Sequence, residues 1–388
     1  MLNQIEFFGY GTIKNLESIL EKENSKKLFL VRGKNSYKLS GAEQAINPII
    51  SSYNYQEFYN FSSNPKLEEI EKGFNLFNKE DYDTLIAVGG GSAIDVAKAI
   101  KLFSIQKNSN TENKKFSVSQ TQGTQRVFDR KISLIAIPTT AGGGSEATHF
   151  IVYYEGKKKQ SKGDENLTLP NYTVCDPQLT LSLSIYMAAA TGIDALSQAI
   201  ESYWSVNSTS ESKKFSEEAI RLLIKNLDLS TNKTDLSSRE KVMRAANLAG
   251  KAINIARTTA CHSISYPITS FFEIPHGHAV GLTLGEMLSY NSEVSDNDCT
   301  DKRGASYVQK TIMEIVDMLG VKTTIEAKDS LQCLMKDVGL ETRLSKLGIS
   351  RDGIDIIVEN GFTPERMKNN PRLINKENLK VILDNIYK

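Results

Sequence analysis

Three of the four histidines in the chain fall between positions 262 and 278, and this crowding is the first sign of a chemical site. The three are His262, His276 and His278. Imidazole is the commonest neutral metal ligand and the usual acid–base group near pH 7, so the cluster predicts a metal or acid–base site. A second interpretation stays open, because Pro275 and Gly277 mark a turn around His276 and histidines in turns are often only solvated.

Two oxygen-bearing side chains, Asp194 and Gln198, lie four positions apart upstream of the histidines. The surrounding residues are good helix formers with one apolar face, which predicts a helix. Residues four apart share a helix face and can direct two oxygens to one ion. By spacing alone, a first-turn carboxylate near the helix dipole and a solvated amide are the better explanation of the pair. The histidines shift the interpretation towards a shared metal site.

The composition is that of a globular protein with nearly balanced charge. The 388 residues are 40% hydrophobic and 24% charged, and 47 basic against 46 acidic side chains give a net charge of +1. This length allows two domains, and the charge balance offers no basic surface for nucleic acid or anionic membranes. The lack of a long apolar run and of a leader-like start predicts a cytoplasmic protein. The four cysteines form no CxxC pair, which argues against a disulfide framework.

The first half of the chain alternates strand-like and helix-like segments. Short apolar runs at residues 28–31, 84–88 and 133–138 predict buried strands. Strand, crossover helix and strand imply a parallel sheet covered on both faces. Ligands of such sheets collect at the carboxyl ends of the strands, so we expect a nucleotide-binding domain.

A glycine-rich turn follows the second of these strands. Gly89, Gly90 and Gly91 precede a predicted helix, so backbone N–H groups and the helix dipole could meet an anion there. Ser92 and Asp95 form a pair that resembles a capping box and would fix this helix terminus. A phosphate-binding loop and a plain strand-to-helix turn both remain possible.

A second turn of this kind follows residues 133–138, where Thr139 and Thr140 offer hydroxyls ahead of three glycines at 142–144. Two such turns at adjacent strand ends could hold the two ends of a dinucleotide. The polar stretch at 106–131 between them is predicted to be an exposed excursion without chemistry of its own.

The second half is helical from about residue 184. Periodic apolar residues predict helices at 239–254, 307–319 and 375–387, and Ser208 with Glu211 predicts a capping box for a further helix. We therefore expect an α/β dinucleotide-binding domain at 1–182 and an all-helical metal and substrate domain at 183–388, with the site between them.

Four motifs, in this order and spacing, resemble the iron-containing (group III) alcohol dehydrogenases over essentially the whole chain: GGGSAIDVAKAI, PTTAGGGSEAT, TGIDALSQAIESYW and the histidine stretch. The resemblance implies a Rossmann-like domain and a helical domain in the dehydroquinate synthase-like architecture. It implies a divalent metal, Fe2+ or Zn2+, held by Asp194, Gln198, His262 and His276. It also implies NADH or NADPH, bound by Gly33, Gly89, Gly90, Gly91, Ser92, Asp95, Thr139 and Thr140.

Three positions depart from the family pattern. Gln198 stands where the family usually has histidine, and an amide oxygen is a weaker, harder ligand for late transition metals. Tyr266 replaces a further family histidine, so this phenol, a water or the cofactor ribose would deliver the catalytic proton. Gly33, between Arg32 and Lys34, replaces an aspartate that would repel a 2′-phosphate, which should permit NADP(H).

A narrower resemblance concerns the substrate. Residues 201–212 and 253–280 are similar to the phosphonoacetaldehyde reductases of phosphonate biosynthesis, which form 2-hydroxyethylphosphonate. That likeness suggests four candidate residues for binding the phosphonate, whose cationic or donor groups suit an anion: His149, Arg257, Ser263 and His278. Arg257 as a helix-end charge and His278 as a turn residue are the simpler alternatives.

The expected chemistry is hydride transfer from the nicotinamide to an aldehyde whose oxygen is polarised by the metal. The expected partner is thus a small aldehyde or alcohol, and the oligomeric state, a homodimer included, is left open. Three rival functions also stay open: another group III alcohol dehydrogenase, a lyase or cyclase resembling dehydroquinate synthase, and a non-catalytic nucleotide-binding protein in which Gln198 and Tyr266 mark a decayed site.

Overall fold

The computed structural model describes residues 4–107, 131–156 and 158–388. These form two compact units, of which unit 1 comprises Met1–Thr140 and Ser145–Ser182 and unit 2 comprises Ala141–Gly144 and Leu183–Lys388. The four residues Ala141–Gly144, which follow strand β5, thus belong to the helical unit. The sequence did not reveal this. Most of the polar stretch predicted at 106–131 lies outside the described residues.

Unit 1 is built on a six-stranded parallel sheet with the strand order β1-β8-β5-β4-β2-β3. An antiparallel pair, β6 and β7, lies outside this sheet. The predicted parallel sheet is confirmed. The three predicted strands are β2, β4 and β5, whereas β1, β3 and β8 were not foreseen. The strands are β1 (Ile5–Phe8), β2 (Lys27–Arg32), β3 (Asn54–Phe58), β4 (Thr84–Gly89), β5 (Ser133–Pro138), β6 (Ile151–Glu155), β7 (Lys158–Lys162) and β8 (Tyr172–Cys175).

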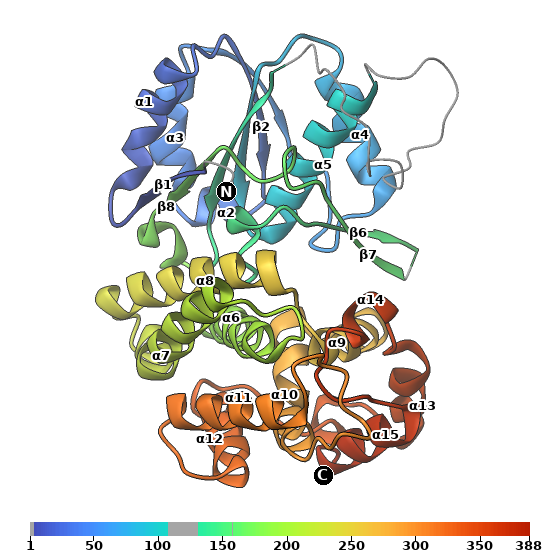
Figure 1. Ribbon diagram of the computed structural model, residues 1–388. Helices are drawn as coiled ribbons and strands as arrows, with labels where there is room; N and C mark the ends of the chain where they lie inside the picture. Colours follow the sequence, from blue (N-terminus) through green and yellow to red (C-terminus); the bar gives the residue numbers. More distant parts are fainter. Residues whose placement is uncertain (1–3, 108–130, 157) are drawn as a thin grey trace. The chain divides into compact units, whose positions relative to one another are not determined.

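Helices cover both faces of this sheet, as Figure 1 shows for the blue and cyan part of the chain. Alternate residues of β2 explain the two layers, since Leu28 and Leu30 join one apolar core while Phe29 and Val31 join the other. Strands β4, β5 and β8 and the central residues of β2 are buried on both sides, as expected for a parallel sheet. The first core packs against α1 (Asn15–Lys22), α2 (Ser36–Leu39) and α3 (Ala42–Ile50), and the second against α4 (Leu67–Phe77) and α5 (Gly91–Lys107).

Unit 2 consists of helices in its described residues, without a strand of either sheet. Helices α6, α7 and α8 pack on one another, and α10 packs on α6, α9 and α12. The helices are α6 (Ile185–Trp204), α7 (Ser210–Asn232), α8 (Leu236–Ala256), α9 (Ala260–Phe272), α10 (His276–Ser292), α11 (Ala305–Met318), α12 (Thr324–Asp337), α13 (Arg351–Asn360), α14 (Pro364–Met367) and α15 (Lys376–Asn385).

The capping box predicted at Ser208 and Glu211 is wrong by one residue. Thr209 caps α7, and its hydroxyl accepts from the backbone of Ser212 while the Ser212 hydroxyl accepts from the Thr209 backbone. Ser208 is buried, and its hydroxyl accepts a hydrogen bond from Arg303 at 3.1 Å. A tertiary contact therefore uses the hydroxyl that the local pattern assigned to the cap.

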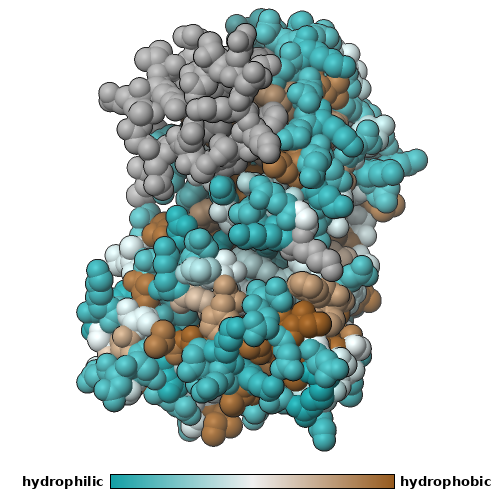
Figure 2. Space-filling view, turned by 90° about the vertical axis from the view of Figure 1, so that its right-hand side faces the viewer, coloured by the Kyte–Doolittle hydropathy of each residue, from teal (hydrophilic) through white to brown (hydrophobic). Residues whose placement is uncertain are grey.

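The described helices include none that combines the length and the apolar character needed to cross a bilayer. The face seen in Figure 2 is largely hydrophilic, with smaller apolar patches between the polar residues.

Candidate active site

Three helices of unit 2 carry the four predicted metal ligands. Asp194 and Gln198 lie on α6, His262 lies in the first turn of α9, and α10 begins at His276. Asp194 lies in the middle of α6, so its interpretation as a first-turn charge is wrong. His276 starts a helix and is not a residue of a solvated turn.

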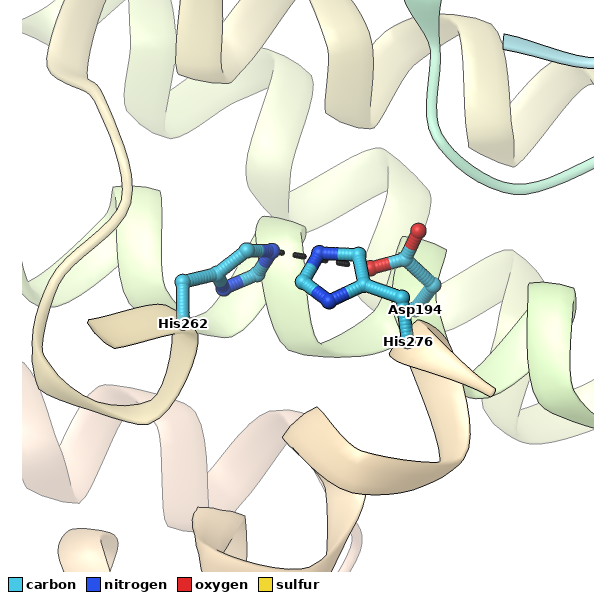
Figure 3. Close-up of side chains that lie close together, drawn as sticks. All are labelled: Asp194, His262 and His276. Atoms are coloured by element: carbon cyan, nitrogen blue, oxygen red, sulfur yellow. Dashed lines mark ion pairs between the residues drawn. The ribbon is translucent and has the colours of Figure 1, made fainter. Parts of the chain in front are cut away.

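The side chains of Asp194, His262 and His276 converge, and one potential ligand atom from each lies within 4.8 Å of the others. Figure 3 shows the three side chains pointing toward one another from their separate helices. The Nε2 atom of His262 lies 3.5 Å from Oδ1 of Asp194, and the two imidazole rings lie 5.4 Å apart. One carboxylate and two imidazoles at this spacing can enclose a single cation.

Gln198 completes the set one turn after Asp194. Its Nε2 donates to the carbonyl oxygen of Gly143 at 3.3 Å, which fixes the amide plane. Its Oε1 is buried and, like Nε2 of His262, has no hydrogen-bond partner among the described residues. Leaving such an atom unpaired costs about 1–3 kcal/mol, and an ion is one explanation for it. The donors therefore fit a divalent metal of intermediate hardness.

Glu201 is a residue of this site that the sequence analysis missed. It is fully buried and accepts hydrogen bonds from the backbone and hydroxyl of Thr259, at 3.0 and 2.7 Å, and from Nδ1 of His262. A carboxylate bonded to Nδ1 keeps a proton there and leaves Nε2 for a metal. The spacing could have revealed it, because Asp194, Gln198 and Glu201 occupy one face of α6.

The pKa of His262 follows from this enclosure. Burial opposes its protonation, but the carboxylates of Glu201 and Asp194 outweigh burial and raise the pKa of His262 to about 9. Burial likewise opposes ionisation of Glu201, yet His262 and Thr259 stabilise the carboxylate and lower its pKa. Without an ion the two residues form a buried ion pair, and a bound cation replaces the Nε2 proton.

His276 is oriented by Ser265 and by a close approach of two helices. The Ser265 hydroxyl donates to the carbonyl of His262 at 2.7 Å, so it accepts from Nδ1 of His276 at 3.2 Å. A Cβ at Gly277 would lie 2.1 Å from the carbonyl oxygen of Ala190. Glycine at 277 therefore lets the start of α10, with His276, approach α6.

In unit 1, the predicted cofactor residues gather where β2, β4 and β5 end. The backbone N–H of Gly33 donates to Val88 O at 2.9 Å, and that of Thr139 donates to Gly89 O at 3.0 Å. Gly89 has φ 153°, and a Cβ there would lie 2.8 Å from Ala93. The chain runs from β2 outward to β3 and then back to β4 on the other side of β2, which makes this edge a topological switch point.

This edge fits a phosphate group. Gly90, Gly91 and Ser92 are partly exposed at the start of α5, where backbone N–H groups and the helix dipole favour an anion. The side chain of Thr139 is buried, and its hydroxyl oxygen has no hydrogen-bond partner among the described residues. A ligand hydroxyl or phosphate would satisfy it.

Comparison with known proteins decides the family. The profile of "Iron-containing alcohol dehydrogenase" matches residues 4–177, and that of "Fe-containing alcohol dehydrogenase family, C-terminal" matches residues 188–387. The chain belongs to the iron-containing alcohol dehydrogenase family. It is thus an NAD(P)-dependent oxidoreductase that acts on alcohols or aldehydes, and the family implies both a divalent metal and a nicotinamide cofactor.

Three relatives describe the range of this alcohol dehydrogenase family. The phosphonoacetaldehyde reductase of Streptomyces viridochromogenes is 32% identical, over 76% of this chain and 74% of that protein. The NAD-dependent methanol dehydrogenase of Bacillus methanolicus is 26% identical, over 97% of this chain and 96% of that protein. The crystal structure of sulfoacetaldehyde reductase from Bifidobacterium kashiwanohense in complex with NAD+ is 28% identical with a TM-score of 0.85, covering 100% of this chain and 97% of that chain.

Tyr266, the departure from the alcohol dehydrogenase pattern, lies beside the cluster. It follows His262 by one turn of α9, and its ring lies 6.1 Å from the ring of His276. Its hydroxyl accepts a hydrogen bond from Nε of Arg366 at 3.2 Å. A phenol is therefore present next to the cluster, where the proton-carrying group was expected.

The expected contact of His278 with substrate is contradicted. This histidine is buried, with Nδ1 3.0 Å from the hydroxyl of Tyr186 and Nε2 2.6 Å from the carbonyl oxygen of Glu341. Burial lowers its pKa, so the ring is held neutral. Both nitrogens bond within the protein, and the residue links α6 and α10 to the chain after α12.

The other three substrate candidates lie in different settings. Ser263 is buried, and its hydroxyl bonds to Gly361 O at 2.6 Å and to the backbone N–H of Thr363 at 2.7 Å, so its role is structural. Arg257 is exposed at the end of α8, as its helix-end alternative expected. His149 is buried in unit 1.

The predicted capping pair of Ser92 and Asp95 is wrong. Ser92 donates to the carbonyl oxygen of Ser63. Asp95 is buried and accepts from the Ser145 hydroxyl at 2.5 Å and from the Val152 N–H at 3.0 Å. Both carboxylate oxygens therefore hold protein segments, which contradicts the expected cofactor contact of Asp95.

The second glycine turn does not resemble the first in its surroundings. It lies in unit 2, where a Cβ at Gly142 would be 2.6 Å from Thr191 and one at Gly144 would be 2.6 Å from Gly250. These glycines let the chain pack against α6 and α8. The phosphate interpretation therefore remains for the glycines of the first turn and not for those of the second.

Arg32, expected to favour a 2′-phosphate, is already paired. Its Nε and Nη2 donate to Glu57 at 3.0 and 2.7 Å, and its guanidinium lies 4.0 Å from the ring centre of Tyr59. Glu57 neutralises the charge on which the NADP(H) expectation partly rested. Lys34 remains as an exposed cation beside Gly33.

Proposed function

We propose that this alcohol dehydrogenase reduces a small aldehyde with an anionic tail, phosphonoacetaldehyde in the first instance, to 2-hydroxyethylphosphonate in phosphonate biosynthesis. The name of the 32% identical relative supports this substrate. Sulfoacetaldehyde, named in the similar crystal structure, is chemically an aldehyde with a sulfonate in place of the phosphonate. We propose that residues 1–182 hold the dinucleotide and residues 183–388 hold metal and substrate.

The observation that carries the proposal is the convergence of buried donors in unit 2. We assign the metal to Asp194, Gln198, His262 and His276, whose potential ligand atoms are oriented by Gly143, Glu201 and Ser265. When bound, the metal polarises the aldehyde oxygen and the nicotinamide supplies the hydride.

The remaining roles fall to residues of this chain. Tyr266 holds a proton at Oη beside His276, and we assign it delivery of that proton to the product oxygen. The N–H groups of residues 90–92 and the hydroxyls of Thr139 and Thr140 bind and orient the dinucleotide.

The test is a rate assay of the metal-loaded enzyme with NADH and NADPH in turn, offering phosphonoacetaldehyde, sulfoacetaldehyde and propanal. We expect net oxidation of the reduced nicotinamide, fastest with phosphonoacetaldehyde. A lyase resembling dehydroquinate synthase would leave the cofactor unchanged overall, and a non-catalytic protein would turn over none of the aldehydes. Faster turnover of propanal would favour a general alcohol dehydrogenase, as the methanol dehydrogenase relative suggests.

Changing Gln198 to histidine should preserve the metal site and bind Zn2+ more tightly than the wild type, because imidazole is a softer donor than an amide oxygen. Gln198→Leu is the matched control, since it removes Oε1 at similar volume and should weaken metal binding. Dissociation constants from competition with a chelator measure both. Equal affinities in all three proteins would show that position 198 is not a ligand.

Replacing Gly277 with alanine should loosen the site through its backbone. The new Cβ would lie 2.1 Å from Ala190 O, so the start of α10 must move away from α6 and carry His276 with it. We expect a stability loss of about 1–3 kcal/mol and weaker metal binding. Gly285→Ala on the same helix is the control, because its new Cβ would lie 3.3 Å from the nearest atoms, which belong to Lys328. Denaturant unfolding and metal analysis report the two effects, and unaltered metal binding in Gly277→Ala would contradict the argument.

A further inference from the structure

An anionic substrate tail needs a cation near the metal cluster. The candidate phosphonate-binding residues of unit 2 that the sequence suggested do not supply one. His278 and Ser263 bond to protein groups, and Arg257 ends α8 in an exposed position. One guanidinium that the sequence did not single out does lie near the cluster.

Arg366 on α14 is half-buried, and its Nε donates to the hydroxyl of Tyr266 at 3.2 Å. The Tyr266 ring lies 6.1 Å from His276, whose ring lies 5.4 Å from that of His262. A permanent positive charge therefore contacts Tyr266, whose ring in turn lies beside a member of the metal cluster.

The segment that carries Arg366 is fixed on both sides, although α14 itself is short. Ahead of α14, Ser263 on α9 bonds to Gly361 O and to the N–H of Thr363, at 2.6 and 2.7 Å. After α14, the buried Asn369 donates to the carbonyl oxygen of Thr258 at 2.9 Å. Arg366 is thus held against α9, the helix of His262 and Tyr266, before any substrate arrives.

We infer that Arg366 is a specificity-determining residue that binds the tetrahedral oxyanion, phosphonate or sulfonate, of the aldehyde substrate. The inference rests on the proposed reduction of an aldehyde at the cluster. The guanidinium keeps its positive charge at any working pH, and its planar fork of N–H donors suits the oxygens of such a group. A two-carbon aldehyde would then have its carbonyl at the cluster and its charged end at Arg366.

The test compares Arg366→Ala and Arg366→Lys with the wild-type metal-loaded enzyme on three aldehydes: phosphonoacetaldehyde, sulfoacetaldehyde and uncharged propanal. For Arg366→Ala we expect kcat/KM to fall on the order of 10- to 100-fold more for the two anions than for propanal, because propanal loses only the effect of the bond to Tyr266. Lysine should restore part of the loss, because it keeps the charge without the fork. Arg221→Ala on α7 removes a surface cation paired with Glu217 and should change no rate.

A binding measurement separates recognition from turnover. Calorimetric titration of 2-hydroxyethylphosphonate into metal-loaded enzyme without nicotinamide should give binding in the wild type and a matching loss in Arg366→Ala. An equal loss of kcat for charged and neutral aldehydes would mean that Arg366 only positions Tyr266, which overturns the inference. A wild-type enzyme that reduces propanal but neither anion also overturns it, while leaving the dehydrogenase chemistry intact. Failure to reduce any aldehyde would refute the proposed function itself.

Discussion

Replacing Asp194 with alanine is expected to remove the bound metal and to lower aldehyde reduction to background. The carboxylate supplies an oxygen within 4.8 Å of both imidazole donors and is the only charged ligand, so its loss leaves the cation with an incomplete set of neutral ligands. Polarisation of a carbonyl by a metal is worth several kcal/mol, which corresponds to a fall in kcat of about 10³-fold or more. Metal analysis of the purified variant and a rate assay measure the two losses independently.

His262→Ala should show the same losses, with an additional cost in stability. It leaves Glu201 buried without its cationic partner, a change that typically costs about 3–5 kcal/mol. Asp194→Asn is therefore the cleaner companion variant, since it keeps the shape of the site. Asp228→Ala, on the exposed side of α7, is the control for a carboxylate lost elsewhere in unit 2. Full activity of metal-free Asp194→Ala protein would refute the assignment.

Changing Glu201 to glutamine is expected to weaken metal binding by about 10- to 100-fold while leaving the ligands themselves in place. The carboxylate accepts from Nδ1 of His262 and from Thr259, and an amide of the same shape cannot accept all of these bonds. His262 then loses the group that fixes its ring and its Nδ1 proton.

Metal titration distinguishes this positioning role from direct catalysis. If Glu201 acts through His262, saturating metal should restore most of the activity of Glu201→Gln. The metal concentration that gives half-maximal activity should rise, while the maximal activity stays similar. Glu218→Gln, an exposed substitution on α7, should leave the curve where it is. A variant with wild-type metal affinity but little activity would instead give Glu201 a direct part in the reaction.

The sequence singled out Asp194, His262 and His276, and the structure places one potential ligand atom from each within 4.8 Å of the others. Asp194 and Gln198 share one face of α6. His262 and His276 lie on α9 and α10, which are consecutive helices later in the chain. Glu201 was missed although it lies on the same face, since a glutamate in a helix is usually solvated. Only the approach of Thr259 and His262, about sixty positions away, explains its burial.

Long-range packing also explains the errors of the local patterns. The two glycine turns have similar composition, yet one ends a strand of the sheet and the other packs against Thr191 and Gly250. Serine at 92 and at 208 matched a capping pattern, but Ser63 and Arg303 use those hydroxyls. The unpredicted strands β1 and β3 lie at the two edges of the sheet and are only partly buried, so they lack the continuous apolar runs of β2, β4 and β5.

The chain leaves the sheet unit at Thr140, spends four residues in the helical unit, and returns at Ser145. The carbonyl oxygen that orients Gln198 belongs to this short excursion, directly after the two threonines that we assign to the dinucleotide. A bound metal and a bound dinucleotide would each restrict this stretch of backbone. Coupling between two binding sites is reciprocal. Any change that the metal makes in nicotinamide affinity should therefore equal the change that nicotinamide makes in metal affinity.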